Sequence, residues 1–184
     1  MESDTLALLV DWVRSRHYGK YRGTVADNQD ATNRGRLKVT VPAVLDTLEV
    51  WAMPCIPYAG KGVGFLALPP TGSGVWVEFE GGDPSFPIWT GCFWADGEAP
   101  ENANPAIKIW KTDSLQVRLD DDNDEALIEN GSQARVQLAA DVVAEAGQAK
   151  HSVGSAGVVS TQGVGKVEVT SASVSLNNGA LEVT

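Results

Sequence analysis

The chain has 184 residues and a net charge of −10 at pH 7, enough length for one or two small domains. The acidic excess lies mostly after residue 112, where eleven Asp and Glu residues accompany four Lys and Arg residues. This charge argues against a nucleic-acid ligand, because phosphate binding requires Lys and Arg. No apolar run approaches the roughly 18 residues of a membrane-spanning helix, and the first residues lack a signal-peptide layout. We expect a chain made soluble and unprocessed.

Residues 1–19 predict a short helix. Leu6, Leu9, Val10 and Val13 recur at helical spacing and form one apolar stripe within residues 4–16. Gly19 follows as a residue suited to ending the helix. The helix either packs on its own domain or docks as an arm on a neighbouring subunit, and the sequence leaves both arrangements open.

Residues 20–94 predict a small β domain of five strands. The alternation of Val75, Val77 and Phe79 with other residues indicates a strand with one buried face. The expected strands span residues 21–26, 36–41, 50–56, 74–80 and 86–93, with turn-forming residues between them. Five short antiparallel strands in about 75 residues indicate an OB-type Greek-key barrel. Cys55 and Cys92 fall in apolar segments, which predicts buried thiols in a protein made in a reducing compartment.

The composition changes near residue 100. All six Trp residues lie between Trp12 and Trp110, all nine Pro residues lie at or before Pro105, and no Phe, Trp or Tyr follows Lys111. Aromatic side chains supply much of an ordinary globular core, so the second part of the chain has to bury its surface in another way. Residues 95–107 are polar and predict a linker, which leaves residues 108–184 as a separate domain.

A sixteen-residue repeat runs through residues 108–184. Gly131, Gly147, Gly163 and Gly179 are evenly spaced, and the residues between them are mostly Val, Ala, Ser, Thr and Gln. A fixed period with a glycine at each corner is typical of repeating β structure, in which glycine forms the turns. Strands of this kind cannot bury their apolar side chains within one short chain. The repeat therefore predicts a shaft that associates with further chains.

Several short motifs resemble the OB domain of the phage baseplate assembly protein V family, the central spike of contractile tails, a domain that the VgrG proteins of type VI secretion share. The motifs cover about residues 20–94 and occur in this order: Gly23-Thr-Val25, Gly35-Arg-Leu-Lys-Val39, Pro42, Trp51, Pro54, Pro70-Thr-Gly72, Gly74-Val-Trp-Val-Glu-Phe79, Gly81-Gly-Asp-Pro84 and Pro87-Ile-Trp-Thr-Gly91. The β repeat that follows them is similar to the family's next part, a β-helix or β-prism of three chains. The expected fold is thus all-β: a short helix, a five-stranded OB-type barrel and a trimeric intertwined β-helix or β-prism.

The resemblance implies a homotrimer at the tip of a contractile injection machine. Its OB domains would bind the baseplate hub, and its shaft would be driven through the target envelope when the sheath contracts. The particle component would be made in the cytoplasm of a bacterial host. Only about 19 residues precede the barrel, which implies a hub on a separate chain and favours a phage or a phage-tail-like bacteriocin over type VI secretion.

Two further expectations concern the tip of the shaft. Many members of the family end in a His-x-His pair that holds iron, whereas this sequence has only His17 and His151, so we expect no apex metal. Three copies of His151 could meet on a threefold axis, but a lone histidine on a polar strand is more often solvated, and that is the expectation here. The last segment has the character of an unfinished strand, which predicts a base at Ala180, Leu181, Val183 and Thr184 that carries a separate PAAR-like tip protein.

The sequence predicts neither an enzyme nor a cofactor site. Residues 120–125 are rich in Asp but lack the spacing of an EF-hand loop, which indicates a solvated turn rather than a calcium site. Residues 60–64 lack the spacing of a phosphate-binding loop, so we expect a turn there as well. With two histidines far apart, no convincing set of nucleophile and base is present, and we expect no catalytic residue.

One alternative function belongs to a different class. Arg34, Arg36 and Lys38 lie on or beside a barrel strand, and many OB folds bind oligosaccharides or nucleic acids. The chain could then be a binding module on a trimeric β stalk, as in a tail fibre. The slightly negative charge of the barrel favours contacts with the hub or with other subunits instead. Peptidoglycan hydrolysis is a third hypothesis.

Overall fold

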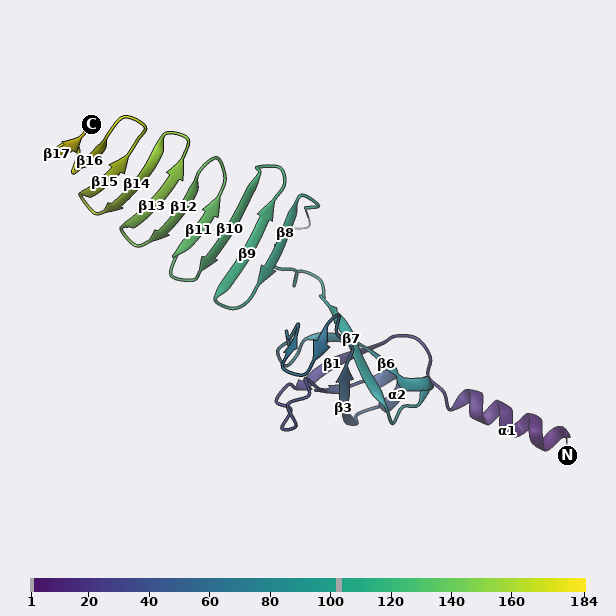
Figure 1. Ribbon diagram of the computed structural model, residues 1–184. Helices are drawn as coiled ribbons and strands as arrows, with labels where there is room; N and C mark the ends of the chain where they lie inside the picture. Colours follow the sequence, from purple (N-terminus) through teal and green to yellow (C-terminus); the bar gives the residue numbers. More distant parts are fainter. Residues whose placement is uncertain (1, 102–103) are drawn as a thin grey trace. The chain divides into compact units, whose positions relative to one another are not determined.

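The computed structural model describes residues 2–101 and 104–184. The chain forms two compact units, Met1–Glu98 and Ala99–Thr184 (Figure 1). The expected linker at residues 95–107 includes residues 102–103, and the expected N-terminal segment includes residue 1; these three lie outside the described residues. Among the described residues, none of the helices has both the length and the apolar character needed to cross a bilayer.

The first unit contains the predicted barrel. Strands β1 (Tyr21–Asp27), β2 (Leu37–Thr40), β3 (Glu49–Pro54), β7 (Pro87–Phe93) and β6 (Gly74–Phe79) form a closed barrel in that order. Pairing of β1 with β6 closes it, and β3 with β7 is its parallel pair, while the other neighbours are antiparallel. Five strands closed in this way form an OB-type barrel, which confirms the prediction.

Alternation along the strands builds the barrel core. In β6 the side chains of Val75, Val77 and Phe79 point inward, and β2 contributes Leu37 and Val39 in the same way. These side chains are at most 6% exposed, because successive residues of a strand point to opposite faces. The full set of buried hydrophobic residues is Val25, Leu37, Val39, Val41, Ala52, Val75, Val77, Phe79 and Trp89.

Short elements connect the barrel strands. Helix α2 (Pro42–Leu45) follows β2, and its Val44 and Leu45 pack against the core. The hairpin of β4 (Ala59–Gly60) and β5 (Val63–Gly64) lies in a segment expected to be a turn, whereas the 3-10 turn η1 (Glu80–Gly82) begins at the last residue of an expected strand.

The N-terminal helix α1 (Glu2–Arg14) agrees closely with the predicted one. The side chains of residues 5–14 are all exposed, including the expected stripe and Trp12. After the helix the chain is attached to η1 and the turn that follows it: the His17 amide donates to the Gly82 carbonyl at 2.8 Å, and Arg16 pairs with Asp83 at 2.9 Å. The described residues of the first unit therefore leave the apolar stripe uncovered.

The second unit is one antiparallel sheet of ten strands that follow each other in sequence order (Figure 1). The strands are β8 (Ile107–Lys111), β9 (Leu115–Asp120), β10 (Glu125–Asn130), β11 (Arg135–Leu138), β12 (Val142–Ala146), β13 (Ala149–Gly154), β14 (Gly157–Gln162), β15 (Gly165–Val169), β16 (Val174–Leu176) and β17 (Leu181–Val183). Every strand pairs with the one before it, which is the pattern expected of one face of a β-prism. The all-β class is confirmed.

The prediction of buried thiols is wrong. Cys55 and Cys92 are both free and exposed. Cys55 comes directly after the last residue of β3, and Cys92 lies near the end of β7 between the half-buried Gly91 and Phe93. Cys55 lies past the end of its strand and Cys92 is the second-to-last residue of β7, so an apolar segment alone does not place a side chain in the core.

Candidate functional site

The register of the ten-stranded sheet separates its side chains into two chemically different faces. Residues that oppose each other across a strand pair point to the same face, and the face alternates along each strand. Leu138 therefore shares a face with Val142, and Val142 with Val153, because these residues are direct partners. Following the partners through all ten strands assigns each residue to one face.

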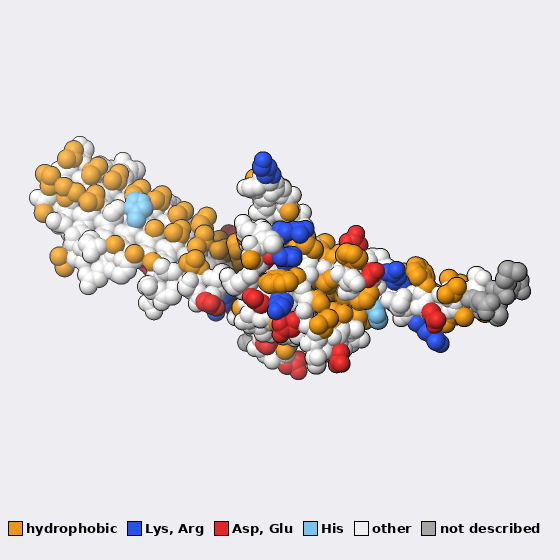
Figure 2. Space-filling model, turned by 90° about the horizontal axis from the view of Figure 1, so that it is seen from below, with side chains coloured by type: hydrophobic (Ala, Val, Ile, Leu, Met, Phe, Trp, Pro, Cys, Tyr) orange, Lys and Arg blue, Asp and Glu red, His pale blue; other side chains and the backbone are white. Residues whose placement is uncertain are grey.

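One face is almost entirely apolar, and we call it the apolar face. Its side chains, in chain order, are Lys108, Trp110, Leu115, Val117, Leu119, Ala126, Ile128, Asn130, Val136, Leu138, Val142, Ala144, Ala146, Ala149, His151, Val153, Val158, Ser160, Gln162, Val167, Val169, Val174, Leu176, Leu181 and Val183. Figure 2 shows hydrophobic side chains gathered over the sheet, with a histidine among them.

The described residues of the second unit leave the apolar face uncovered. Leu138 is 51% exposed, Val142 47% and Val153 42%, although each lies in the middle of the sheet among other apolar side chains. An antiparallel sheet commonly has one face packed and one in water, and here the face suited to packing is the open one. A continuous exposed apolar surface of this length marks an interaction site.

The opposite face carries ladders of paired charges. Arg135 opposes Glu145, which opposes Lys150, and both cations bind the Glu145 carboxylate at 2.8 and 3.1 Å. The hydrogen bonds from Lys150 and Arg135 hold the pKa of Glu145 below its usual value. Opposite charges in direct cross-strand pairs stabilise a sheet, and this face suits contact with water.

The repeat glycines lie at turns along one edge of this sheet. Gly131, Gly147, Gly163 and Gly179 fall between β10 and β11, β12 and β13, β14 and β15, and β16 and β17, so one period corresponds to two strands with their two turns. Gly147, Gly163 and Gly179 have φ of 60°, 57° and 95°, a conformation that only glycine adopts at little cost. In the first turn Gln133 adopts the positive φ, 62°, in place of Gly131.

Two other predicted positions differ from their expectations. His151 lies on the apolar face between Ala149 and Val153, not on a polar strand as expected. The alternation of residues 149–153 was the available signal, since both neighbours on that face are apolar. Residues 120–125 do form a turn, but Asp120 is only 5% exposed: its carboxylate accepts hydrogen bonds from the amides of Asp122 and Asn123 at 3.1 Å.

The predicted tip residues belong to the last strand of the sheet. Leu181 and Val183 lie on the apolar face and are 58% and 63% exposed, whereas Ala180 and Thr184 flank β17. Strand β17 pairs with β16 only, so its other edge is unpaired within the described residues.

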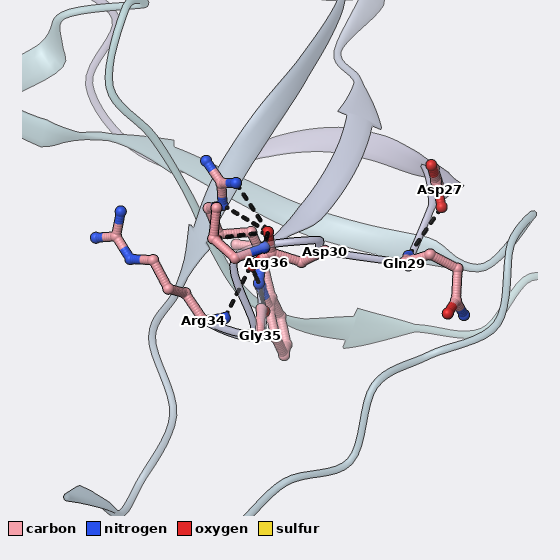
Figure 3. A network of polar contacts seen from close by, with 8 residues as sticks. Asp27, Gln29, Asp30, Arg34, Gly35 and Arg36 are labelled. Carbon is pink, nitrogen blue, oxygen red and sulfur yellow. Dashed lines mark hydrogen bonds and ion pairs between the residues drawn. The ribbon is translucent and has the colours of Figure 1, made fainter. Parts of the chain in front are cut away.

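On the barrel, the loop between β1 and β2 is organised by one carboxylate (Figure 3). The Asp30 side chain, 3% exposed, accepts hydrogen bonds from the backbone amides of Thr32 and Arg34 at 3.0 and 2.9 Å and from the Arg36 guanidinium at 2.8 Å. The hydrogen bond from Arg36 is the main reason why the pKa of Asp30 lies far below its usual value. Arg36 also lies over the Trp51 ring, with 5.2 Å from its Cζ to the ring centroid.

Two of the three candidate basic residues are thus occupied within the barrel. Arg36 is paired with Asp30, and Lys38 pairs with Glu49 at 3.1 Å. Arg34 is exposed, and Figure 3 shows its side chain directed away from the Asp30 carboxylate. Cations that are already neutralised contribute little to phosphate binding, which argues against a nucleic-acid groove here. Within the described part of the chain, no three His, Cys, Asp or Glu side chains are grouped for metal binding.

The fold combines a closed OB-type barrel with a ten-stranded antiparallel sheet whose apolar face is exposed in the single chain. Residues 21–94 match the family described as the type VI secretion system/phage-baseplate injector OB domain. A comparison with curated proteins finds no match. The barrel therefore belongs to the baseplate protein V-like family, and the chain has a structural role in a phage baseplate or type VI injector. A baseplate protein of this family is a component of the tail.

Proposed function

We propose that the chain is the central spike of a contractile tail baseplate, a homotrimer that punctures the target envelope when the sheath contracts. This proposal rests on one observation: the ten-stranded sheet, which follows an injector-type OB barrel in the sequence, has an open apolar face. Three sheets with their apolar faces turned inward would form a closed β-prism. Such a prism buries the apolar side chains and leaves the charged ladders in water.

A prism of this kind suits mechanical work. Each chain contributes a continuous hydrogen-bonded sheet, so an axial load is carried by many short strands and not by a flexible connection. The charged outer face resists sideways association with other particles, since each chain carries a net charge of −10. The proposed action is puncture without chemical turnover.

The two ends of the spike would bind different proteins. We place the baseplate hub at the barrel end, as the baseplate family of that domain suggests. The exposed helix α1, with Leu6, Leu9 and Trp12 uncovered, gives the hub or a neighbouring subunit an apolar element to bind. At the other end, β17 offers an unpaired edge to a small PAAR-like tip protein.

The rival function, a ligand-binding module on a stalk, is less well supported. It would need a free polar or basic groove on the barrel, whereas Arg36 and Lys38 are held in ion pairs. An affinity of the isolated protein for oligosaccharide or single-stranded nucleic acid would favour the rival.

The absolute mass of the purified protein tests the proposal first. Light scattering should give three times the 19.5 kDa of the chain, independent of concentration. A denaturing gel with matched boiled and unboiled samples should show the trimer only in the unboiled lane, because a closed prism opens slowly. A monomer, or a dimer made of two sheets packed face to face, would refute the trimeric spike.

A further inference from the structure

The apolar face carries one polar cluster in its middle strands. His151 of β13 and Ser160 of β14 are direct cross-strand partners, and the His151 Nδ1 lies 2.7 Å from the Ser160 Oγ. Gln162 follows on the same face. Around them the face is apolar or small: Ala149 and Val153 flank His151 along its strand, and Ala144 opposes it on β12. A polar cluster in this position is costly to bury unless it has a partner.

We propose that three copies of His151, one from each chain of the trimer, bind one divalent transition-metal ion on the axis of the shaft. This inference rests on the proposed trimeric prism. It adds a site that no single chain contains, because the ligands come from three subunits.

The position of His151 along its strand suits an axial ligand. Strand β13 spans six residues, Ala149–Gly154, and the inward residues are 149, 151 and 153, so His151 lies near the middle of the prism face. Strands rise about 3.4 Å per residue, so each face is about 20 Å wide and the axis of an equilateral prism lies about 6 Å from each face. An imidazole spans about that distance from the backbone, and three of them meet at the axis.

The bond to Ser160 prepares the ring for metal binding. In the tautomer in which the Nδ1–H of His151 donates to the Ser160 Oγ, Nε2 keeps its lone pair and points away from that bond. No hydrogen bond to Nε2 occurs among the residues that the structure describes. Neutral imidazole is a preferred ligand of Zn²⁺, Ni²⁺, Cu²⁺ and Fe²⁺, and three imidazoles leave positions for solvent.

The surroundings of the cluster favour a cation of this size. Ala144 and Ala149 next to His151 leave space that Val or Leu would fill, so the closed prism would contain a small chamber at this level. Ser160 and Gln162 supply oxygen atoms beside it. The negative charge of the chain lowers the cost of holding a cation within the shaft.

The test uses untagged protein, stripped of metal with a chelator and then titrated with Co²⁺, whose visible spectrum reports imidazole ligation. We expect one Co²⁺ per three chains. His151→Gln should abolish binding, whereas His17→Gln, which removes the sequence's other histidine, should leave it unchanged. Ser160→Ala should weaken binding by roughly 10- to 100-fold, because the hydroxyl only positions the ring. Light scattering on every variant measures the assembly separately.

The outcomes separate the two proposals. A wild-type trimer that binds no Co²⁺, or binds it equally well in the His151→Gln variant, overturns the metal site and leaves the spike intact. A wild-type protein that is not a trimer overturns both. If His151→Gln does not assemble, the Ser160→Ala affinity decides: an unchanged affinity in a trimeric variant also overturns the site.

Discussion

Val142 and Val143 provide a direct test of which face of the sheet is buried in the assembled protein. They are adjacent in β12, with Val142 on the apolar face and Val143 on the charged face. In the single chain Val142 is 47% exposed and Val143 is half-buried. The substitutions Val142→Glu and Val143→Glu are therefore chemically identical and differ only in the face they change.

The two variants should differ by a large free energy of assembly. Full burial of a valine is worth about 1.5–3 kcal/mol, so covering the exposed half of Val142 contributes about 1 kcal/mol per copy and about 3 kcal/mol per trimer. A glutamate at that position also brings three carboxylates into the apolar interior, at several kcal/mol each. The loss is then on the order of 10 kcal/mol or more per trimer. At Val143 the carboxylate remains in water beside Gln137 and Ser152, and the cost is about 1 kcal/mol or less per copy.

Light scattering and unheated denaturing gels measure this difference. Val142→Glu should yield monomers or aggregates, and Val143→Glu should yield the wild-type oligomer. A chain that functions alone would respond in the opposite order, because Val143 is the better covered residue in the monomer. Equal effects, or a larger effect at Val143, would refute the assembly through the apolar face.

Three further predictions concern the stability of the separate parts. Leu37→Ala, at a fully buried core position, should destabilise the barrel by about 2–5 kcal/mol in urea unfolding, whereas Leu48→Ala at a 59% exposed position should cost little; similar costs would contradict the barrel core. The pKa of Asp30 is lowered in the folded barrel, so the contribution of its carboxylate to folding stability is complete above the ordinary pKa near 3.9 and is lost as the pH falls below that value. A series of melting temperatures from pH 7 to 2 should therefore show a shallower decline in acid for Asp30→Asn than for the wild type. Parallel curves would count against a stabilising ion pair between Asp30 and Arg36. Gly147→Ala should cost about 1–2 kcal/mol because of its positive φ, and Gly131→Ala should be close to neutral; thermal melts in which the two lose equal stability would speak against the turn geometry.

The sequence by itself determined the elements of both parts. Alternation at Val75, Val77 and Phe79 and the turn-forming residues between strands define the barrel strands within a few residues, because a half-buried strand has to follow a period of two. The even spacing of the repeat glycines likewise predicts a β repeat, since turns need residues that tolerate unusual backbone conformations. Strand alternation and turn formation both depend on residues that are close together in the sequence, so a short sequence pattern is enough to predict them.

Only the tertiary structure decided how these elements are partnered. The parallel contact of β3 with β7 joins residues far apart in sequence, and no local pattern encodes it. The ion pair of Asp30 and Arg36 forms because the loop between β1 and β2 reverses the chain and brings the two opposite charges together. In the same way, the cross-strand register places His151 among apolar side chains, because the face of a residue follows from its partners on both neighbouring strands and not from the residue itself.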